Sequence, residues 1–181
     1  MKIDKNEFFR EATLRICGSL EIEQALWLLF TFIQDYIPSF ETHLHHYDSA
    51  GITRTIAMAD NSGGKRLRRK TIYPPEVREY INSKKIEEDY IADNTNKHPA
   101  LKYVFKNHNK IKMSTLAIRL RVGKSWVGGI TLNARGHNSF TNEHLELLSL
   151  LEKPITIALS NSLRYQELLD LKERISDDNR F

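Results

Sequence analysis

The chain has 181 residues, of which 40% are hydrophobic, and this is enough to build the core of one globular domain. Lysine and arginine outnumber aspartate and glutamate by 27 to 23, and the resulting net charge of +4 is far below that of a dedicated nucleic-acid-binding domain. The single cysteine, Cys17, excludes an intrachain disulfide and a thiolate metal cluster. The charged first residues do not resemble a signal peptide, and the longest apolar stretch, 25–33, is too short to cross a bilayer, so we expect a cytoplasmic protein that contacts no membrane.

The first forty residues predict two helices. In 7–16, apolar residues recur at steps of three and four, and Gly18 ends this pattern. A second helix, 19–36, is apolar on almost every side and ends before Pro38. Such a helix must be covered on several sides, which places it in the core or at a subunit interface.

Beyond residue 40 the hydrophobic period changes to two, which is typical of β-strands. Strands 42–48 and 52–59 flank a short turn, 49–51, and strands 115–122 and 126–134 form a second pair. Two such hairpins predict a largely antiparallel sheet. The segment between them is too long for one structureless loop. We expect it to contain a short helix at 75–82, a short strand at 89–92 and a helix at 99–107.

A run of basic residues at 65–70 follows the glycine-containing segment 61–64, and we expect it to lie on a loop. A single basic cluster is common on ordinary protein surfaces. A solvated loop is therefore favoured over a phosphate-binding patch.

The last segment predicts the longest helix, from a cap at Thr141 to about Asp177. Pro154 removes one backbone hydrogen bond, so we expect a kink near residue 150. Residues along this helix alternate steps of three and four, the spacing of a coiled-coil seam: Leu148, Leu151, Ile155, Ala158, Ser162, Tyr165 and Leu169. The charged stretch after Gln166 would be poorly stable alone, which suggests that it pairs with another helix.

Several segments together resemble the junction between the sensory domain and the ATPase module in sigma-54-dependent bacterial transcription activators. The segments are FTNEHL (140–145), PITIALSN (154–161), RYQEL (164–168) and DDNRF (177–181), with the strand patches LAIRL (116–120) and GGITL (128–132). The order of elements, a helix pair, a hairpin, a mixed insert, a second hairpin and a long terminal helix, is also that of GAF domains. The resemblance covers nearly the whole chain and is specific mainly after residue 115.

The resemblance implies an α+β, GAF/PAS-like fold with a central antiparallel β-sheet. Long N- and C-terminal helices would cover one face, and the mixed helical insert would cover the other. Residues 1–165 would form the GAF sensory domain, and 166–181 a helical linker toward an AAA+ ATPase module absent from this chain. The domain would sense a small molecule and control that ATPase through its C-terminal helix, while other parts of the activator would bind sigma-54 RNA polymerase and DNA.

Strand alternation divides the sheet residues between two faces. We expect apolar residues to face the helices: Leu44, Ile56, Met58, Leu116, Ile118, Leu120, Ile130 and Leu132. The opposite face would then carry His43, His45, Tyr47, Thr55, Ala57, Arg119, Thr131 and Asn133. Either this is a solvated sheet face, or it is the floor of a ligand pocket roofed by residues 73–108, to which Asp93 and Tyr103 would contribute. The ligand would be an unidentified small molecule, and no cofactor is assigned.

Arg119 is the only strongly cationic side chain expected on the interior of that polar face. A guanidinium removed from water without partners is very costly. It must therefore meet an acidic residue of the insert, such as Asp89 or Asp93, or an anionic ligand.

The other candidate motifs in the sequence do not favour a metal site, a phosphate-binding loop or a catalytic site. His43 and His45 share a strand face, but no further strong ligand accompanies them, so polar or pocket-lining histidines are favoured over a metal site. The tripeptide 123–125 lacks the upstream glycine and the helix that a phosphate-binding loop requires. No nucleophile motif or paired-carboxylate arrangement is recognisable, so we expect no enzyme activity.

We expect a homodimer, because a monomer would expose a large apolar patch. The candidate interface residues are Trp27, Phe30, Leu148, Ile155, Tyr165 and Leu169. Two alternatives stay open: a structural dimerisation domain with a vestigial pocket, and an enzyme of the methionine-sulfoxide reductase type, which would need reactive cysteines in the pocket.

Overall fold

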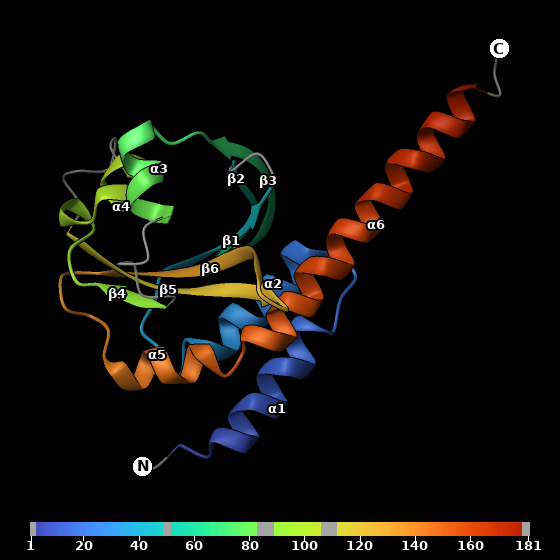
Figure 1. The fold of residues 1–181 in the computed structure, drawn as a ribbon. Helices are drawn as coiled ribbons and strands as arrows, with labels where there is room; N and C mark the ends of the chain where they lie inside the picture. The colour runs from blue at the N-terminus through green and yellow to red at the C-terminus, as the bar shows by residue number, and fades with distance from the viewer. Residues whose placement is uncertain (1–2, 49–51, 83–88, 106–111, 179–181) are drawn as a thin grey trace.

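The computed structural model describes residues 3–48, 52–82, 89–105 and 112–178, and it has a layered α+β architecture (Figure 1). Its centre is a six-stranded antiparallel sheet in the order β3-β2-β1-β6-β5-β4. The strands are β1 (Glu41–Tyr47), β2 (Thr53–Asp60), β3 (Gly63–Thr71), β4 (Tyr90–Ala92), β5 (Met113–Val122) and β6 (Ser125–Arg135). This arrangement confirms the expected fold class.

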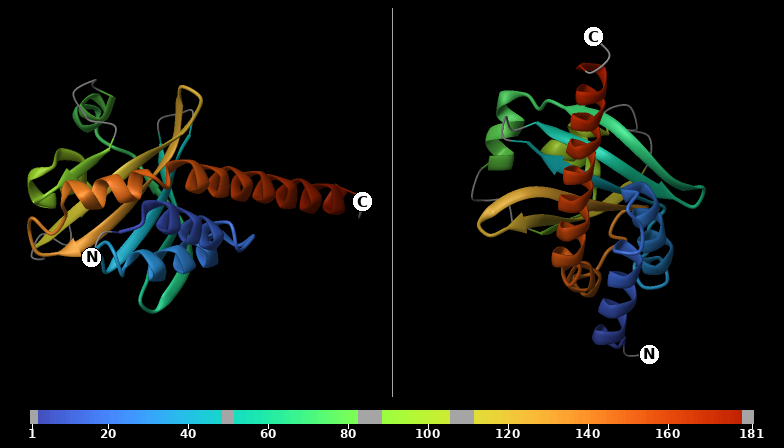
Figure 2. Two further views of the ribbon diagram at one scale, coloured as in Figure 1. Left: turned by 90° about the horizontal axis from the view of Figure 1, so that it is seen from below. Right: turned by 90° about the vertical axis from the view of Figure 1, so that its right-hand side faces the viewer.

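The helices divide between the two faces of the sheet (Figure 2). One face is covered by α1 (Lys5–Ile16), α2 (Ile22–Ile33), α5 (Asn142–Ser149) and the first part of α6 (Glu152–Asp178). The other carries α3 (Pro75–Asn82), the short 3-10 helix η1 (Thr95–Lys97) and α4 (Pro99–Val104). The C-terminal part of α6 projects away from the body of the domain. None of the described helices combines the length and the apolar composition that crossing a membrane requires.

The core lies between the sheet and the α1, α2, α5 and α6 layer. Phe30, Leu44, Leu120, Ile130 and Leu159 are fully buried there. Burial of each such side chain stabilises a fold by roughly 1.5–3 kcal/mol relative to exposure. The helix predicted to be apolar on almost every side, α2, is therefore part of the core of a single chain.

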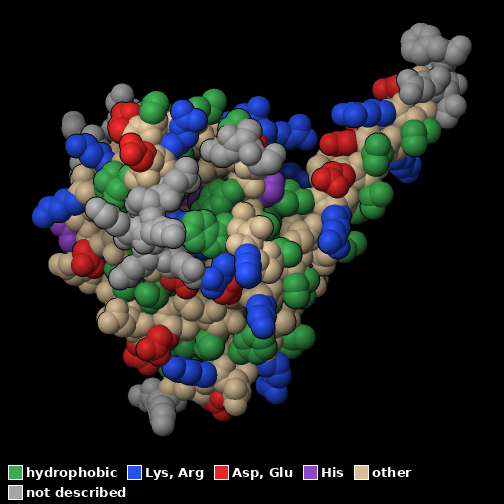
Figure 3. Space-filling view, viewed as in Figure 1, with side chains coloured by type: hydrophobic (Ala, Val, Ile, Leu, Met, Phe, Trp, Pro, Cys, Tyr) green, Lys and Arg blue, Asp and Glu red, His purple; other side chains and the backbone are tan. Residues whose placement is uncertain are grey.

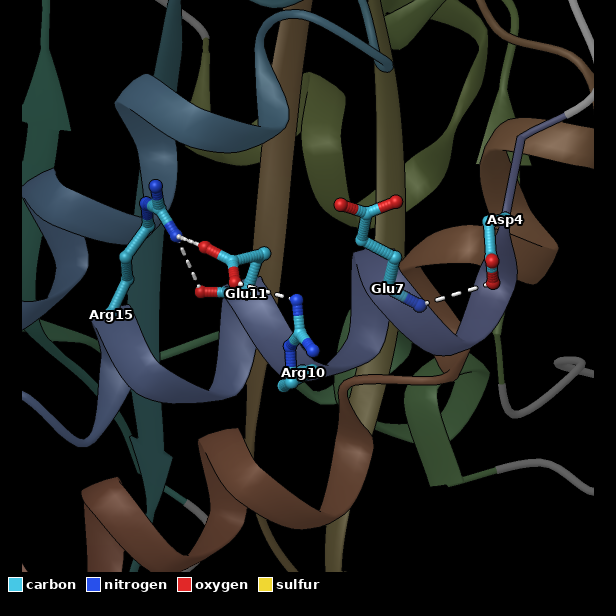
Figure 4. Close-up of polar contacts among 5 residues, drawn as sticks. All are labelled: Asp4, Glu7, Arg10, Glu11 and Arg15. Atoms are coloured by element: carbon cyan, nitrogen blue, oxygen red, sulfur yellow. Dashed lines mark hydrogen bonds and ion pairs between the residues drawn. The ribbon is translucent and has the colours of Figure 1, made fainter.

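Helix α1 is held by polar contacts at its start and along its surface (Figure 4). Asp4 caps it by accepting hydrogen bonds from the backbone N–H groups of Asn6 at 2.9 Å and Glu7 at 3.1 Å. Glu11 pairs with Arg15 at 3.0 Å, and this contact holds the pKa of the Glu11 carboxyl below its usual value. The Arg15 guanidinium also lies 4.4 Å from the centre of the Phe32 ring, which ties α1 to α2.

The basic run at 65–70 forms most of strand β3, so the prediction of a loop was wrong. Asp60 accepts a hydrogen bond from the Ser62 N–H at 2.7 Å, which closes a tight turn, and the chain then returns antiparallel to β2. Charged side chains suit this position because β3 is an edge strand, and charges oppose pairing with other sheets. Arg66 anchors the strand by bonding Glu23 of α2 at 3.0 Å and Gln166 of α6 at 2.9 Å.

The predicted facing was also wrong for Ala57 and Met58 of β2, because the register between β1 and β2 shifts between Leu44 and His45. Leu44 lies opposite Ala57, so Ala57 packs in the core rather than on the opposite face. Met58 lies opposite His43 and therefore shares the face of that histidine. A bulge of this kind reverses the alternation on one side of the irregularity.

The long C-terminal helix is broken rather than kinked: α5 ends at Ser149 and α6 begins at Glu152. Pro154 lies in the first turn of α6, where its missing N–H costs no helical hydrogen bond. The predicted cap is confirmed, since the Thr141 side chain accepts a hydrogen bond from the His144 N–H at 3.4 Å.

Three of the expected dimer-interface residues are unavailable to a partner. Phe30, Leu148 and Ile155 have no exposed surface, because they pack in the core of their own chain. Trp27 is half-buried against the same core, whereas Tyr165 and Leu169 on the projecting part of α6 are 46% and 36% exposed. The first half of the predicted seam therefore packs onto the domain itself.

Candidate functional site

A cavity of about 420 Å³ lies between the sheet and helices α3 and α4. The surface is hollowed beside α3, and hydrophobic side chains lie at the bottom of the hollow (Figure 3). The volume is within the range of about 300–1,000 Å³ typical of small-molecule sites. The sheet contributes His43, His45, Tyr47, Thr115, Ala117, Arg119, Trp126, Gly129, Thr131 and Asn133 to the lining. The other side and the rim include Arg69, Tyr73, Arg78, Tyr90, His98, Leu101, Val104 and Phe105.

The floor is built by strand alternation across three neighbouring strands. His43 of β1 lies opposite Thr131 of β6, and Ala117 of β5 lies opposite the same threonine. Arg119 of β5 lies opposite Gly129, which leaves room for a neighbouring phenol: a Cβ atom at position 129 would lie 2.9 Å from the Tyr47 hydroxyl oxygen. Most of the predicted floor residues therefore line one cavity.

His45 is fixed by two threonines. Its Nδ1 lies 3.1 Å from the Thr55 hydroxyl, and its Nε2 lies 3.3 Å from the Thr131 hydroxyl. Its ring stacks against His43 with 6.2 Å between the ring centres. Thr55 is not part of the lining, so its role is to orient His45.

Burial keeps the cavity histidines neutral. It lowers the pKa of His45 from its ordinary value of 6.5 to about 3, and the nearby His43 and Arg69 act in the same direction. Burial also lowers the pKa of His43 and of His98. Within the described segments, no group of three or more His, Cys, Asp or Glu side chains is arranged to hold a metal ion.

The insert side of the cavity is aromatic. Tyr90 stacks on His98 with 4.8 Å between ring centres and 9° between planes, and Tyr80 meets the same histidine edge-on. Burial raises the pKa of Tyr90 and raises that of Tyr73 to about 12, so both phenols keep their protons at neutral pH.

Arg119 faces the cavity and is only 7% exposed, and of the two expected kinds of partner, an insert carboxylate or an anionic ligand, the structure shows no ion pair with Asp89 or Asp93. Its guanidinium lies over the face of Trp126, 3.8 Å from the ring centre. Asp89 instead accepts a hydrogen bond from the Arg119 backbone N–H at 3.0 Å. Across the described ranges, the structure gives the guanidinium no carboxylate partner.

Two predicted insert residues lie outside the cavity. Asp93 follows β4 beside a separate shallow depression, where its backbone carbonyl accepts a hydrogen bond from the Asn138 N–H at 3.2 Å. Tyr103 is on the outer side of α4, 40% exposed, and donates a hydrogen bond to the Ile72 carbonyl at 3.3 Å.

The sequence argument also missed several lining residues. Trp126 reaches the cavity because the register of β5 and β6 shifts between Leu120 and Arg121, and an alternation pattern does not reveal such a shift. Arg69 was missed because its strand was interpreted as a loop. A strand in which basic residues occupy both faces has no apolar face that would identify it.

The neutral buried histidines predict a loss of stability in acid. A lowered pKa in the folded state means that the unfolded chain binds more protons below pH 6.5, so stability falls as pH drops from about 6.5 toward 3. The slope is at most about 1.4 kcal/mol per pH unit for each histidine. Urea unfolding at pH 7.5, 6 and 5 should show a smaller decline for His45→Gln than for the natural chain. The exposed control His137→Gln should keep the natural slope, and an unchanged slope in His45→Gln would contradict the burial argument.

Comparisons with known proteins agree on the architecture. No family model matches the chain. The GAF domain from a phosphoenolpyruvate-protein phosphotransferase of Coxiella burnetii superposes with a TM-score of 0.67 at 16% identity, over 91% of this chain and 97% of that one. The phycocyanobilin-bound GAF domain from a cyanobacterial phytochrome superposes with a TM-score of 0.62 at 15% identity, over 90% of this chain and 97% of that one.

In sequence, 60 residues are 38% identical to the formate hydrogenlyase transcriptional activator of Salmonella typhimurium. The match covers 33% of this chain and 9% of the activator. The superpositions extend over most of the chain, and they match it to the same domain type on which the sequence resemblance rests. The chain therefore has the fold of GAF domains.

Proposed function

We propose that this chain is the ligand-sensing regulatory domain of a sigma-54-dependent transcription activator. A small molecule bound in the cavity changes the arrangement of α6, and α6 passes this change to a downstream AAA+ ATPase. The observation that carries the proposal is that β5, which lines the cavity, also holds the junction of α5 and α6. The resemblance of the C-terminal segments to activator junctions and the local similarity to a transcriptional activator support it.

The first link between cavity and junction is Asp89. One of its carboxylate oxygens accepts the hydrogen bond from the Arg119 backbone N–H at 3.0 Å. The other accepts a hydrogen bond from the Ser149 hydroxyl, at the end of α5, at 2.9 Å. A displacement of β5 at Arg119 therefore acts on the end of α5 through one side chain.

The second link is Arg121, two residues further along β5. This arginine pairs with Glu152 in the first turn of α6 at 3.1 Å. Through Arg119 and Arg121, β5 thus connects the cavity with the start of α6. A ligand shifts such an equilibrium only by its differential affinity for the two arrangements. Contact with Arg119 would supply that difference.

Within this proposal, residues 1–165 are the sensory domain and 166–181 are the linker. Contacts with sigma-54 RNA polymerase and DNA belong to other parts of the activator. The role is regulatory and not catalytic. A reductase of the methionine-sulfoxide type would need a thiol in the cavity, whereas the single cysteine, Cys17, caps the C-terminal end of α1 on the helix-covered face.

A thermal-shift screen tests sensing against a purely structural role. A panel of small metabolites, inorganic anions and metal ions should contain at least one compound that raises Tm, since a ligand at a hundred times its Kd adds about 2.7 kcal/mol. For a chain of this size that is a shift of roughly 5–10 °C. Ala117→Phe, which fills part of the cavity from its floor, should fold and lose the shift. A panel without effect on a properly folded dimer would favour a structural dimerisation domain.

The proposed partner in the homodimer is a second, parallel copy of α6. Its projecting part carries an exposed apolar stripe, with Ile157, Leu168, Leu171 and Ile175 between 52% and 64% exposed. With Asn161 and Arg164 between them, these positions alternate steps of four and three, as in a coiled-coil seam. This face is different from the one predicted from the sequence.

Charge and polarity at the seam favour the parallel arrangement. In a parallel pair Glu167 would lie near Lys172 of the second copy, and by symmetry this opposite-charge contact would form twice. An asparagine at a core position of a seam, here Asn161, is a known device for fixing register.

Leu168→Asp should shift the chain from dimer to monomer in sedimentation equilibrium while the circular dichroism of the domain is retained. Leu20→Asp, at a leucine that is 80% exposed outside the seam, is the matched control and should stay dimeric. Glu167→Lys should weaken the dimer, and adding Lys172→Glu should restore it. A dimer unaffected by Leu168→Asp would contradict the seam, and failure of the double variant to restore affinity would contradict the parallel orientation.

A further inference from the structure

The residues that line the cavity indicate which chemical class of small molecule it binds, and this inference rests on the proposed sensory function. We propose that the cavity binds a small aromatic carboxylate, with the carboxylate at Arg119 and the ring between the aromatic walls. The argument has three parts: a cation that is paired with no carboxylate among the described residues, a hydroxyl donor beside it, and the size and shape of the cavity.

Arg119 supplies the charge. Its side chain is more than nine-tenths buried and reaches the cavity, and in the described part of the chain its guanidinium is paired with no carboxylate. The contact with the Trp126 ring stabilises the cation but provides no acceptor for its N–H donors. A planar carboxylate matches the guanidinium with two parallel hydrogen bonds.

The remaining charges of the lining do not compensate Arg119. Arg69 and Arg78 are also cationic and lie nearer the solvent, so the described lining holds three arginines. Its one acidic residue, Asp48, is already paired with Arg54 at 3.1 Å and accepts the Ile52 N–H at 3.0 Å. A partly enclosed site lined by one sign of charge concentrates the oppositely charged ligand.

A hydroxyl donor lies beside the cation. The Tyr47 hydroxyl sits next to Gly129, and Gly129 is the residue opposite Arg119 on β6. Burial raises the pKa of Tyr47, so the phenol keeps its proton and donates rather than repels an anion. Arg119 of β5 and Tyr47 of β1 therefore converge on one place from the two strands that flank β6.

The size and walls of the cavity select the rest of the ligand. At about 420 Å³ it is far larger than a one-carbon or two-carbon anion, which would leave most of the space to water. Trp126, Tyr73, Tyr90 and His98 contribute aromatic rings to the lining, and Leu101 adds an aliphatic side chain. Flat aromatic surfaces pack well against a planar ring.

Calorimetric titration of the 181-residue chain tests the inference with matched probes. Benzoate, phenylacetate, 4-hydroxybenzoate and 2-naphthoate carry the proposed chemistry. Their primary amides remove the charge, benzylamine reverses it, acetate lacks the ring, and phenyl phosphate changes the anionic head. At least one carboxylate should bind with a Kd below about 1 mM, and its amide should bind about tenfold more weakly or worse, because a charge-assisted pair is lost.

Arg119→Gln should remove the preference for the carboxylate over its amide, and Arg119→Lys should keep part of it. The matched control is Arg68→Gln, which deletes one positive charge from an exposed position of β3 outside the lining and should keep the full preference. Circular dichroism and the Tm of each variant report whether it has folded. Quenching of Trp126 fluorescence, absent in Trp126→Phe, provides a readout that does not depend on heat of binding.

The outcomes separate the inference from the function on which it rests. Equal affinity for amide and carboxylate, tighter binding of acetate or phenyl phosphate, or an unchanged preference in Arg119→Gln would overturn the aromatic carboxylate. If none of these probes binds but another compound of the metabolite panel does, the ligand class is wrong and the sensory function stands. If neither these probes nor that panel binds, both proposals fail.

Discussion

The structure depends on a strand that is buried on both faces. Every residue of β5 from Met113 to Leu120 is buried. One face of the strand packs against the core helices, and the other forms part of the cavity floor. Because both faces of this strand are packed, a displacement of the strand on one face must be accommodated by the residues that pack on the other. Within one short stretch of this strand, Arg119 reaches the cavity and Arg121 pairs with Glu152 of α6.

Helix α6 has two functions along its length, and its sequence pattern contains both. Near its start, Ile155 and Leu159 pack into the core of the domain. Further on, Leu168 and Leu171 are exposed on a different face, where a second copy would cover them. The same continuous helix thus begins at the contacts made by β5 and ends at the proposed dimer seam. A displacement of its first turn would therefore also move the residues of that seam.

Much of the fold and part of the site could be predicted from the sequence, and the failures have physical causes. Regular alternation on β5 correctly placed Arg119 toward the cavity. Alternation failed at Ala57, because a bulge reverses facing without leaving a composition signal. The facing of insert residues such as Tyr103 depends on how short helices dock, which no periodicity encodes. The solved GAF domains share only 15–16% identity with this chain, so they establish the architecture, while the ligand chemistry comes from this chain's own cavity.

The central claim is that binding of a ligand in the cavity changes the stability of the junction between α5 and α6. Amide hydrogen exchange measured with and without the ligand that gives the largest thermal shift tests this most directly. The account predicts slower exchange in β5 and also in residues 147–157, and it predicts that Arg121→Gln weakens the effect at the junction while leaving the effect on β5. Protection confined to the residues that line the cavity, with exchange at the junction unchanged, would contradict it.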